Sequence, residues 1–286
     1  MNEPEHQQDA AATAHSPAPQ NQRMPVIFVG HGSPMNAIED NAYTRHLAAW
    51  AQQLPRPKAI LAVSAHWLTP GRTQIDAQPQ PPTIHDFGGF PEALFSVRYP
   101  APGTEAVAQT TLEILQAHFP LVGLSRDWGL DHGSWSVLCH MYPEADIPVF
   151  QLSINYAEAG EYHYAIGRQL AVLREQGVLI FSSGNITHNL RVLDFQAPES
   201  ARASRAWAQE FDDAVWQALL TRNDAALIDY VSLSPAAKMA VPTPDHYWPL
   251  LYVLGAAAAD EAVQQTYQSF QAGTISMRCL QFGASA

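Results

Sequence analysis

The stretch that decides the fold is VIFVG, Val26 to Gly30, which His31 follows directly. Five residues without a polar side chain predict a short strand that is buried on both faces. Similar apolar runs recur in AILAVSAHW (Ala59–Trp67), IPVFQLSI (Ile147–Ile154) and VLIFSSGN (Val178–Asn185). Because unbroken runs of this length are typical of sheets covered on both faces, the four segments predict a largely parallel or mixed central sheet.

Segments with apolar residues at helical spacing separate these strands. Three of them are Val107–His118, Tyr162–Leu173 and Trp207–Leu219. Strands that alternate with helices indicate an α/β fold, here a single three-layer domain with helices flanking the sheet. We expect this domain over residues 24–286, with TISMRCLQF (Thr274–Phe282) as an edge or antiparallel strand because its polarity alternates.

The composition argues against several classes of function. The formal net charge is -12, and 15 Lys and Arg residues spread over 286 residues do not suggest the basic face that nucleic-acid binding needs. No stretch approaches the ~18 uninterrupted apolar residues of a membrane span. Residues 1–23 are polar and rich in Pro, Gln and Ala, which predicts a disordered tail rather than a signal peptide. We expect a cytoplasmic protein, either a monomer or a homodimer.

Three histidines follow predicted strands. His31 comes directly after the first, His66 ends the second, and His188 follows the fourth. Ligands of open α/β sheets bind outside the carboxyl ends of the strands, so these side chains are expected to converge on one crevice. A single strand-end histidine is more often a hydrogen-bonded structural residue, but three at equivalent ends favour a metal site, because imidazole is a common ligand of Fe and Zn.

Three other histidines are weaker candidates by pattern alone. His85 and His132 lie in loop-like segments, and in each case the adjacent aspartate, Asp86 or Asp131, could orient the ring or cap a turn. His246 lies at a predicted helix start. It points either into the crevice or to the surface beside the helix cap.

The segment Gly71–Pro102 is rich in Pro and Gly and too long for a simple connection, so we predict that it helps to form a site. No GxSxG, P-loop, HExxH or CxxC motif offers a rival site. Ser33 beside His31 is weak evidence for a hydrolytic pair, because no acid partner is identifiable. The remaining histidines are interpreted as structural or as part of the tail: His46, His118, His140 and His163 on predicted helices, and His6 and His15 near the N-terminus.

Several motifs in order resemble the DOPA-dioxygenase branch of the class III extradiol ring-cleaving dioxygenases. They include GHGSPMNAIEDNAYT (Gly30–Thr44), AILAVSAHW (Ala59–Trp67), PPTIHDFGGFP (Pro81–Pro91), DHGSW (Asp131–Trp135), SSGNITHNLR (Ser182–Arg191) and TPDHYWPLLYVLGA (Thr243–Ala256). The resemblance runs from about Met24 to the C-terminus. Many separate motifs in the correct order are far more specific than any one of them.

The resemblance implies a metal site. Its ligands would be His31, His66 and His246, joined by His188 in zinc-loaded members of the family. In the broader superfamily the site has two histidines and a glutamate, and the histidine that corresponds to His188 is the acid/base. Since this sequence offers His246 where that glutamate is expected, His188 is either a ligand or a proton shuttle. The resemblance also suggests that His132 and His85 face the substrate.

The implied reaction opens the ring of a catechol, such as an L-DOPA-like compound, with dioxygen to give a semialdehyde. One divalent metal per chain would bind the two catechol oxygens. Fe(II) is expected for the oxygen chemistry, since zinc is redox-inert, whereas zinc is expected as a bound metal. A histidine suits the proton transfers because its ordinary pKa is ~6.5, and we assign them to His132 or His188.

Two other functions stay open at this point. A permanently bound zinc could activate water for a hydrolytic reaction. Alternatively, the chain could be a metal-binding interaction protein of the same superfamily without enzymatic activity.

Overall fold

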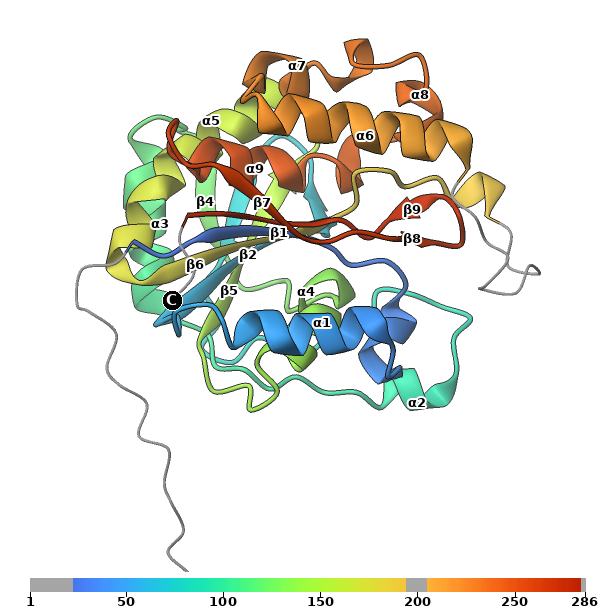
Figure 1. Ribbon diagram of the computed structural model, residues 1–286. Coiled ribbons are helices and arrows are strands. Elements are labelled where there is room, and N and C mark those ends of the chain that lie inside the picture. Colours follow the sequence, from blue (N-terminus) through green and yellow to red (C-terminus); the bar gives the residue numbers. More distant parts are fainter. Residues whose placement is uncertain (1–22, 194–204, 284–286) are drawn as a thin grey trace, which may run out of the picture.

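The computed structural model describes residues 23–193 and 205–283 (Figure 1). Apart from Arg23, the predicted tail over residues 1–23, with His6 and His15, lies outside the described residues. Among the helices of the described ranges, none is both long and apolar enough to cross a bilayer.

The strands of the described residues agree with the predicted runs and add several shorter ones. They are β1 (Val26–Gly30), β2 (Ala59–Thr69), β3 (Thr73–Asp76), β4 (Val122–Ser125), β5 (Val149–Asn155), β6 (Val178–Gly184), β7 (Val263–Tyr267), β8 (Phe270–Gln271), β9 (Ile275–Ser276) and β10 (Cys279–Phe282). The predicted strand at Thr274–Phe282 is therefore two strands, with Met277 and Arg278 between them.

The helices include the three predicted ones, α3, α5 and α6. The α-helices are α1 (Ala42–Ala51), α2 (Glu92–Phe95), α3 (Glu105–Gln116), α4 (His132–Met141), α5 (Gly160–Leu170), α6 (Ala206–Leu220), α7 (Asp224–Ile228), α8 (Ala237–Ala240) and α9 (Pro249–Ala256). Short 3-10 turns are η1 (Pro34–Ile38), η2 (Ala171–Gln176), η3 (Leu190–Val192), η5 (Tyr230–Ser232) and η6 (Pro244–His246).

Eight of these strands form a mixed sheet in the order β4-β3-β5-β2-β6-β1-β10-β7, and β8 pairs with β9 in a separate two-stranded sheet. The centre of the larger sheet is parallel: β2 pairs with β5 and with β6, and β1 pairs with β6. β10 is antiparallel to β1, as one of the two alternatives predicted, but β7 covers its other side, so it is not an edge strand. Since the four central strands run in one direction, their carboxyl ends meet at one edge, where the site can form.

Both faces of the sheet are covered, so the predicted three-layer α/β fold is confirmed (Figure 1). Alternate residues of β1 point to opposite layers: Val26 and Phe28 pack in the core with α3, α5, α6 and α9, whereas Ile27 and Val29 pack in the core with α1 and α4. This two-sided burial is the physical reason for the unbroken apolar runs in the sequence.

A buried ion pair ties α6 to the segment between β9 and β10. Arg278 Nε donates to Asp212 Oδ2 over 3.1 Å, and both side chains are almost wholly excluded from solvent. Ser276 Oγ donates to Asp212 Oδ1 over 2.6 Å, and the Arg278 guanidinium lies over the Trp216 ring at 5.1 Å. The pair fixes the chain just before it enters β10.

Replacing Asp212 with Ala should lower the free energy of unfolding by about 3–5 kcal/mol, because Arg278 then loses its buried counter-charge and keeps only the exposed Asp213 carboxylate, 3.9 Å away. Replacing the pair together, as Asp212→Leu with Arg278→Met, should cost clearly less, since no unpaired charge is left behind. Urea denaturation of both variants measures the difference. An equal loss in the two variants would contradict the ion-pair explanation.

Candidate metal centre and its pocket

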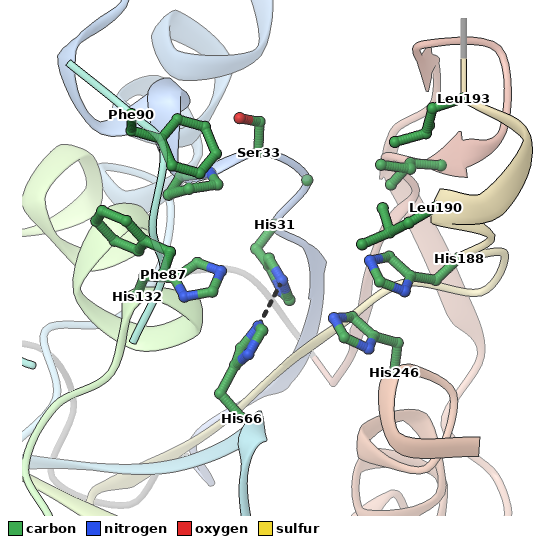
Figure 2. A pocket seen from close by; sticks show the side chains of 13 residues that line it. His31, Ser33, His66, Phe87, Phe90, His132, His188, Leu190, Leu193 and His246 are labelled. Atoms are coloured by element: carbon green, nitrogen blue, oxygen red, sulfur yellow. Dashed lines mark hydrogen bonds between the residues drawn. The ribbon is translucent and has the colours of Figure 1, made fainter. Parts of the chain in front are cut away.

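A cavity of about 410 Å³ opens at the carboxyl ends of the central strands (Figure 2). Five histidines line it on one side and apolar side chains line much of the rest. The lining residues are His31, Gly32, Ser33, Pro34, His66, Phe87, Phe90, His132, His188, Leu190, Leu193, His246 and Ile275. The structure thus brings together all but one of the candidate site histidines from the sequence, the exception being His85.

His31 enters the cavity because the chain turns sharply after β1. Its backbone N–H donates to Gly184 O at the end of β6 over 3.2 Å, which holds the two strand ends together. Gly32 then adopts φ +64°, a left-handed conformation that glycine reaches without steric cost. The turn after β1 therefore explains why glycine follows His31 in the sequence.

His66 points into the cavity from an irregular part of β2. The strand runs to Thr69 rather than ending at His66, and its register against β5 shifts between Val63 and Leu68. Irregularities of this kind re-aim side chains, and they are frequent beside active sites.

His246 reaches the cavity from η6, far along the chain from the strands that position His31 and His66. Asn185 N donates to His246 O over 2.8 Å, so the residue after β6 anchors this turn. A Cβ atom on Gly184 would lie 2.2 Å from His246 O, and the close approach therefore needs glycine. Of the two sequence-based alternatives for His246, the structure shows the buried one that faces the crevice.

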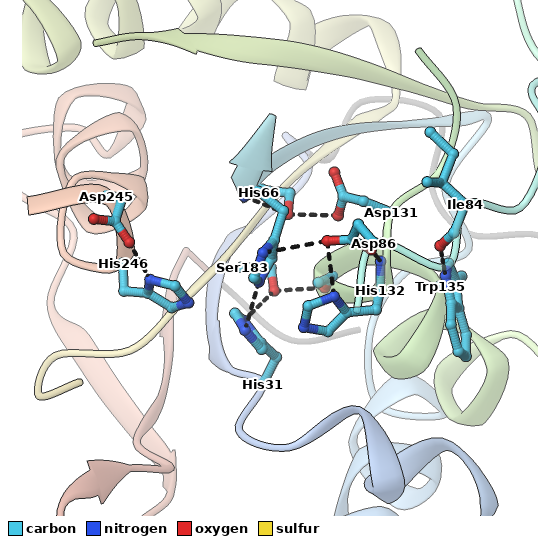
Figure 3. Close-up of polar contacts among 12 residues, drawn as sticks. His31, His66, Ile84, Asp86, Asp131, His132, Trp135, Ser183, Asp245 and His246 are labelled. Carbon is cyan, nitrogen blue, oxygen red and sulfur yellow. Dashed lines mark hydrogen bonds and ion pairs between the residues drawn. The ribbon is translucent and has the colours of Figure 1, made fainter. Parts of the chain in front are cut away.

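The hydrogen bonds around His31 fix which of its ring nitrogens carries the proton. Ser183 Oγ lies 2.9 Å from His31 Nδ1 and 2.5 Å from Gly133 O (Figure 3). A carbonyl oxygen can only accept, so the Ser183 hydroxyl donates to Gly133 and must accept from His31 Nδ1. His31 therefore has its lone pair on Nε2.

Carboxylates lie beside Nδ1 of the other two histidines of this group. His246 Nδ1 donates to Asp245 Oδ2, and because a carboxylate cannot donate, His246 has its lone pair on Nε2 (Figure 3). His66 Nδ1 lies at ion-pair distance from Asp86 Oδ2, 3.3 Å, which favours the same form for this ring. Metal-binding histidines usually have such a partner on the ring nitrogen that faces away from the metal.

His31 Nε2 and His66 Nε2 are 3.2 Å apart. This is a hydrogen bond if His66 carries its proton on Nε2, whereas two lone pairs face each other if Asp86 holds that proton on Nδ1. Burial, followed by the neighbouring histidines, lowers the pKa of both His31 and His66 well below the ordinary range, so no additional proton bridges them at neutral pH. In the Nδ1–H form of His66, the two facing lone pairs at this distance suit a cation between them.

The arrangement fits a transition-metal ion. Potential ligand atoms of His31, His66 and His246 all lie within 4.8 Å of one another. Two nitrogen ligands of one ion, at ~2.0–2.1 Å from it and at ordinary angles, lie about 2.9–3.4 Å apart, a range that includes the observed His31–His66 separation. Neutral imidazoles are also the form that binds metal.

His188 and His132 lie beside this group. The His188 ring stacks on the His246 ring with centroids 3.5 Å apart, and among the described residues its imidazole makes no hydrogen bond. Burial and the nearby His246 lower the pKa of His188 to about 2. The His132 ring lies 3.9 Å from the His66 ring, and its Nδ1 donates to Asp86 Oδ2 over 2.9 Å.

The structure corrects the pairing of aspartates with histidines. The chain neighbour of His85, Asp86, contacts His132 and His66 instead. Asp131, the neighbour of His132, is buried and accepts hydrogen bonds from Ser64, Trp128 and Gln151. His132 is itself the first residue of α4 rather than part of a loop.

His85 lies outside the pocket lining. Its Nε2 contacts Val97 O at 3.1 Å, and its ring packs against Phe87, Phe95 and Trp135. This packing gives it no direct contact with the cavity, in contrast to the substrate-facing position that the resemblance suggests. The histidines interpreted as structural have contacts of their own away from the cavity: His46 stacks on Trp50, His140 contacts Asn36 O, His163 contacts the Tyr252 hydroxyl, and His118 is exposed after α3.

Sequence reasoning missed the apolar wall of the cavity. Phe87 and Phe90 belong to the Gly71–Pro102 segment, so the prediction of a site-forming loop contained the signal for them. Leu190 and Ile275 lie in short elements whose pattern gives no such signal.

Comparison with known proteins identifies the family. Residues 12–279 match the model for the catalytic LigB subunit of aromatic ring-opening dioxygenase. The chain belongs to this family. The resemblance to class III extradiol dioxygenases is thereby confirmed, and with it the prediction of a ring-cleaving dioxygenase.

Relatives of this LigB-family chain span almost its whole length. It is 45% identical over 266 residues to "4,5-DOPA dioxygenase extradiol" of Escherichia coli, covering 91% of this chain and 95% of that protein. The protein of the same name from Beta vulgaris is 36% identical over 263 residues, which is 90% of this chain and 96% of the relative. The crystal structure of an uncharacterised Escherichia coli protein superposes with a TM-score of 0.79 at 39% identity, covering 91% of this chain and all of that one.

Replacing His31, His66 or His246 singly with Ala should remove most of the bound metal, because each substitution deletes one of three facing nitrogens. Elemental analysis and titration with zinc measure the loss. His118→Ala, at an exposed histidine, is the matched control and should retain the metal. Full retention in the His31→Ala and His66→Ala variants would contradict the assignment.

Proposed function

We propose that this chain opens the ring of catechol-type compounds with dioxygen, using one divalent metal held by His31, His66 and His246. The observation that carries the metal site is the convergence of ligand nitrogens from His31, His66 and His246 within 4.8 Å of one another. Family membership supplies the reaction class. The apolar wall beside the histidines suits an aromatic ring, and L-DOPA-like catechols are the substrates that the names of the relatives suggest.

The metal would supply a Lewis-acidic centre for the two catechol oxygens and, as Fe(II), the electrons that zinc cannot donate. Three protein ligands leave positions open for a substrate. Phe87 and Phe90 line the cavity on the side of the η1 turn, and Leu190 and Leu193 line it opposite (Figure 2). These side chains would hold the flat ring and exclude water from it.

The proton transfers fall to the two remaining histidines of the cavity. His132 donates through Nδ1 to Asp86, so its Nε2 can accept a phenolic proton from the substrate. We assign a role as proton shuttle to His188 too, because it lies outside the group of His31, His66 and His246, although it shares a second group of potential ligand atoms with Asp245 and His246. A cytoplasmic location stays a prediction from the sequence.

Oxygen uptake tests the reaction. Protein reconstituted anaerobically with Fe(II) should consume one dioxygen per catechol and form a yellow semialdehyde, whereas zinc-loaded protein should consume none. Ester or amide hydrolysis by the zinc form, without uptake by the iron form, would instead support the hydrolytic alternative. Inactivity of both forms would contradict an enzymatic function.

His132→Ala should lower kcat by about 10²–10⁴-fold, the usual contribution of a positioned acid or base, with zinc affinity nearly unchanged. Steady-state oxygen uptake and zinc titration on the same preparation separate the two effects. Loss of the metal in this variant would make His132 a ligand rather than an acid/base.

A further inference from the structure

One carboxylate serves two of the cavity's histidines. Asp86 Oδ2 lies 2.9 Å from His132 Nδ1 and 3.3 Å from His66 Nδ1, and Asp86 Oδ1 accepts the backbone N–H of His132 over 2.9 Å (Figure 3). Only 13% of the Asp86 side chain is exposed, so water does not replace these partners. The two oxygens thus accept two hydrogen bonds from His132 and lie at ion-pair distance from His66 Nδ1.

A carboxyl group with its ordinary pKa of ~3.9 is a carboxylate at neutral pH. An ionised carboxylate can only accept hydrogen bonds. His132 must therefore hold a proton on Nδ1, which leaves Nε2 of the neutral ring as a base, and His66 Nδ1 is placed at 3.3 Å to do the same.

We propose that Asp86 is a positioning residue that fixes the tautomers of His66 and His132 together. The same carboxylate would then orient His66 as a metal ligand and His132 as an acid/base. The assignment of those two tasks rests on the proposed function, whereas the tautomers themselves do not.

The loop that carries Asp86 is held firmly enough for this role. Trp135 Nε1 donates to Ile84 O over 2.8 Å, and Ile84 N donates to Leu130 O over 2.7 Å. These bonds tie the loop to the start of α4, where His132 lies. Asp86 therefore keeps its place relative to His132 through the backbone as well as through its own side chain.

The substitution Asp86→Asn tests the inference because an amide cannot replace all three interactions. With its oxygen on the His132 backbone N–H, the amide nitrogen faces both Nδ1 atoms and must donate to them. Both rings would then move their proton to Nε2, which removes the lone pair that His66 needs for metal. With the amide reversed, its nitrogen would face the backbone N–H, and that hydrogen bond would be lost.

Histidine ¹⁵N NMR of the zinc-loaded full-length protein reads the tautomers directly. In the wild type, we expect His132 in the Nδ1–H form; in Asp86→Asn, we expect the Nε2–H form. Because His132 is not a proposed ligand, this result does not depend on whether zinc binds or catechol is turned over. An Nε2–H form of His132 in the wild type would overturn the proposal even if the Asn variant fails to fold.

Zinc affinity tests the His66 half of the proposal. Competition with a chelating dye should show binding weaker by about 10–100-fold in Asp86→Asn, the usual cost of losing such a partner, with partial recovery in Asp86→Glu. Asp76→Asn is the matched control, a buried carboxylate that accepts from Gln78, and should leave the affinity unchanged. Unchanged zinc affinity in Asp86→Asn would overturn the His66 half, and an unchanged tautomer would overturn the His132 half.

Discussion

Two imidazole nitrogens, His31 Nε2 and His66 Nε2, are 3.2 Å apart in the histidine-lined cavity. With the protons of both rings on Nδ1, their lone pairs face each other, a contact that is unfavourable without a cation. Ser183 and Asp86 hold the outer nitrogens, and burial keeps both rings uncharged. A metal ion bound between the two nitrogens would relieve this contact.

The fold explains how such an arrangement is held in place. β1, β2 and β6 are parallel and adjacent, so their ends bring His31, His66 and the Ser183 hydroxyl to one edge of the sheet. The third histidine comes from a distant turn that a backbone hydrogen bond from Asn185 fixes. Close approach of this turn to Gly184 leaves no room for a side chain there. Rigid strands set the first two positions, and backbone contacts add the third.

The sequence was sufficient where local chemistry decides the structure. Apolar runs gave the central strands, and strand-end position brought His31, His66 and His188 into one crevice. His246 could be ranked above a surface residue only through the family resemblance, because its place depends on a long-range contact with Asn185. Chain adjacency was misleading for Asp86, since the folding of its loop against α4 turns it toward His132. Hydrophobic periodicity in a sequence reflects which residues are buried. The hydrogen-bond partner of a side chain such as Asp86 depends instead on how distant segments pack.

Anomalous diffraction from crystals of the metal-loaded protein tests the central claim most directly. Data collected on both sides of the metal's absorption edge locate the ion and its ligand atoms without reference to activity. We predict a single ion in the cavity, bound to Nε2 of His31, His66 and His246, with Nδ1 of each ring still on its present partner. An ion bound elsewhere, or bound through the Nδ1 atoms, would contradict this account.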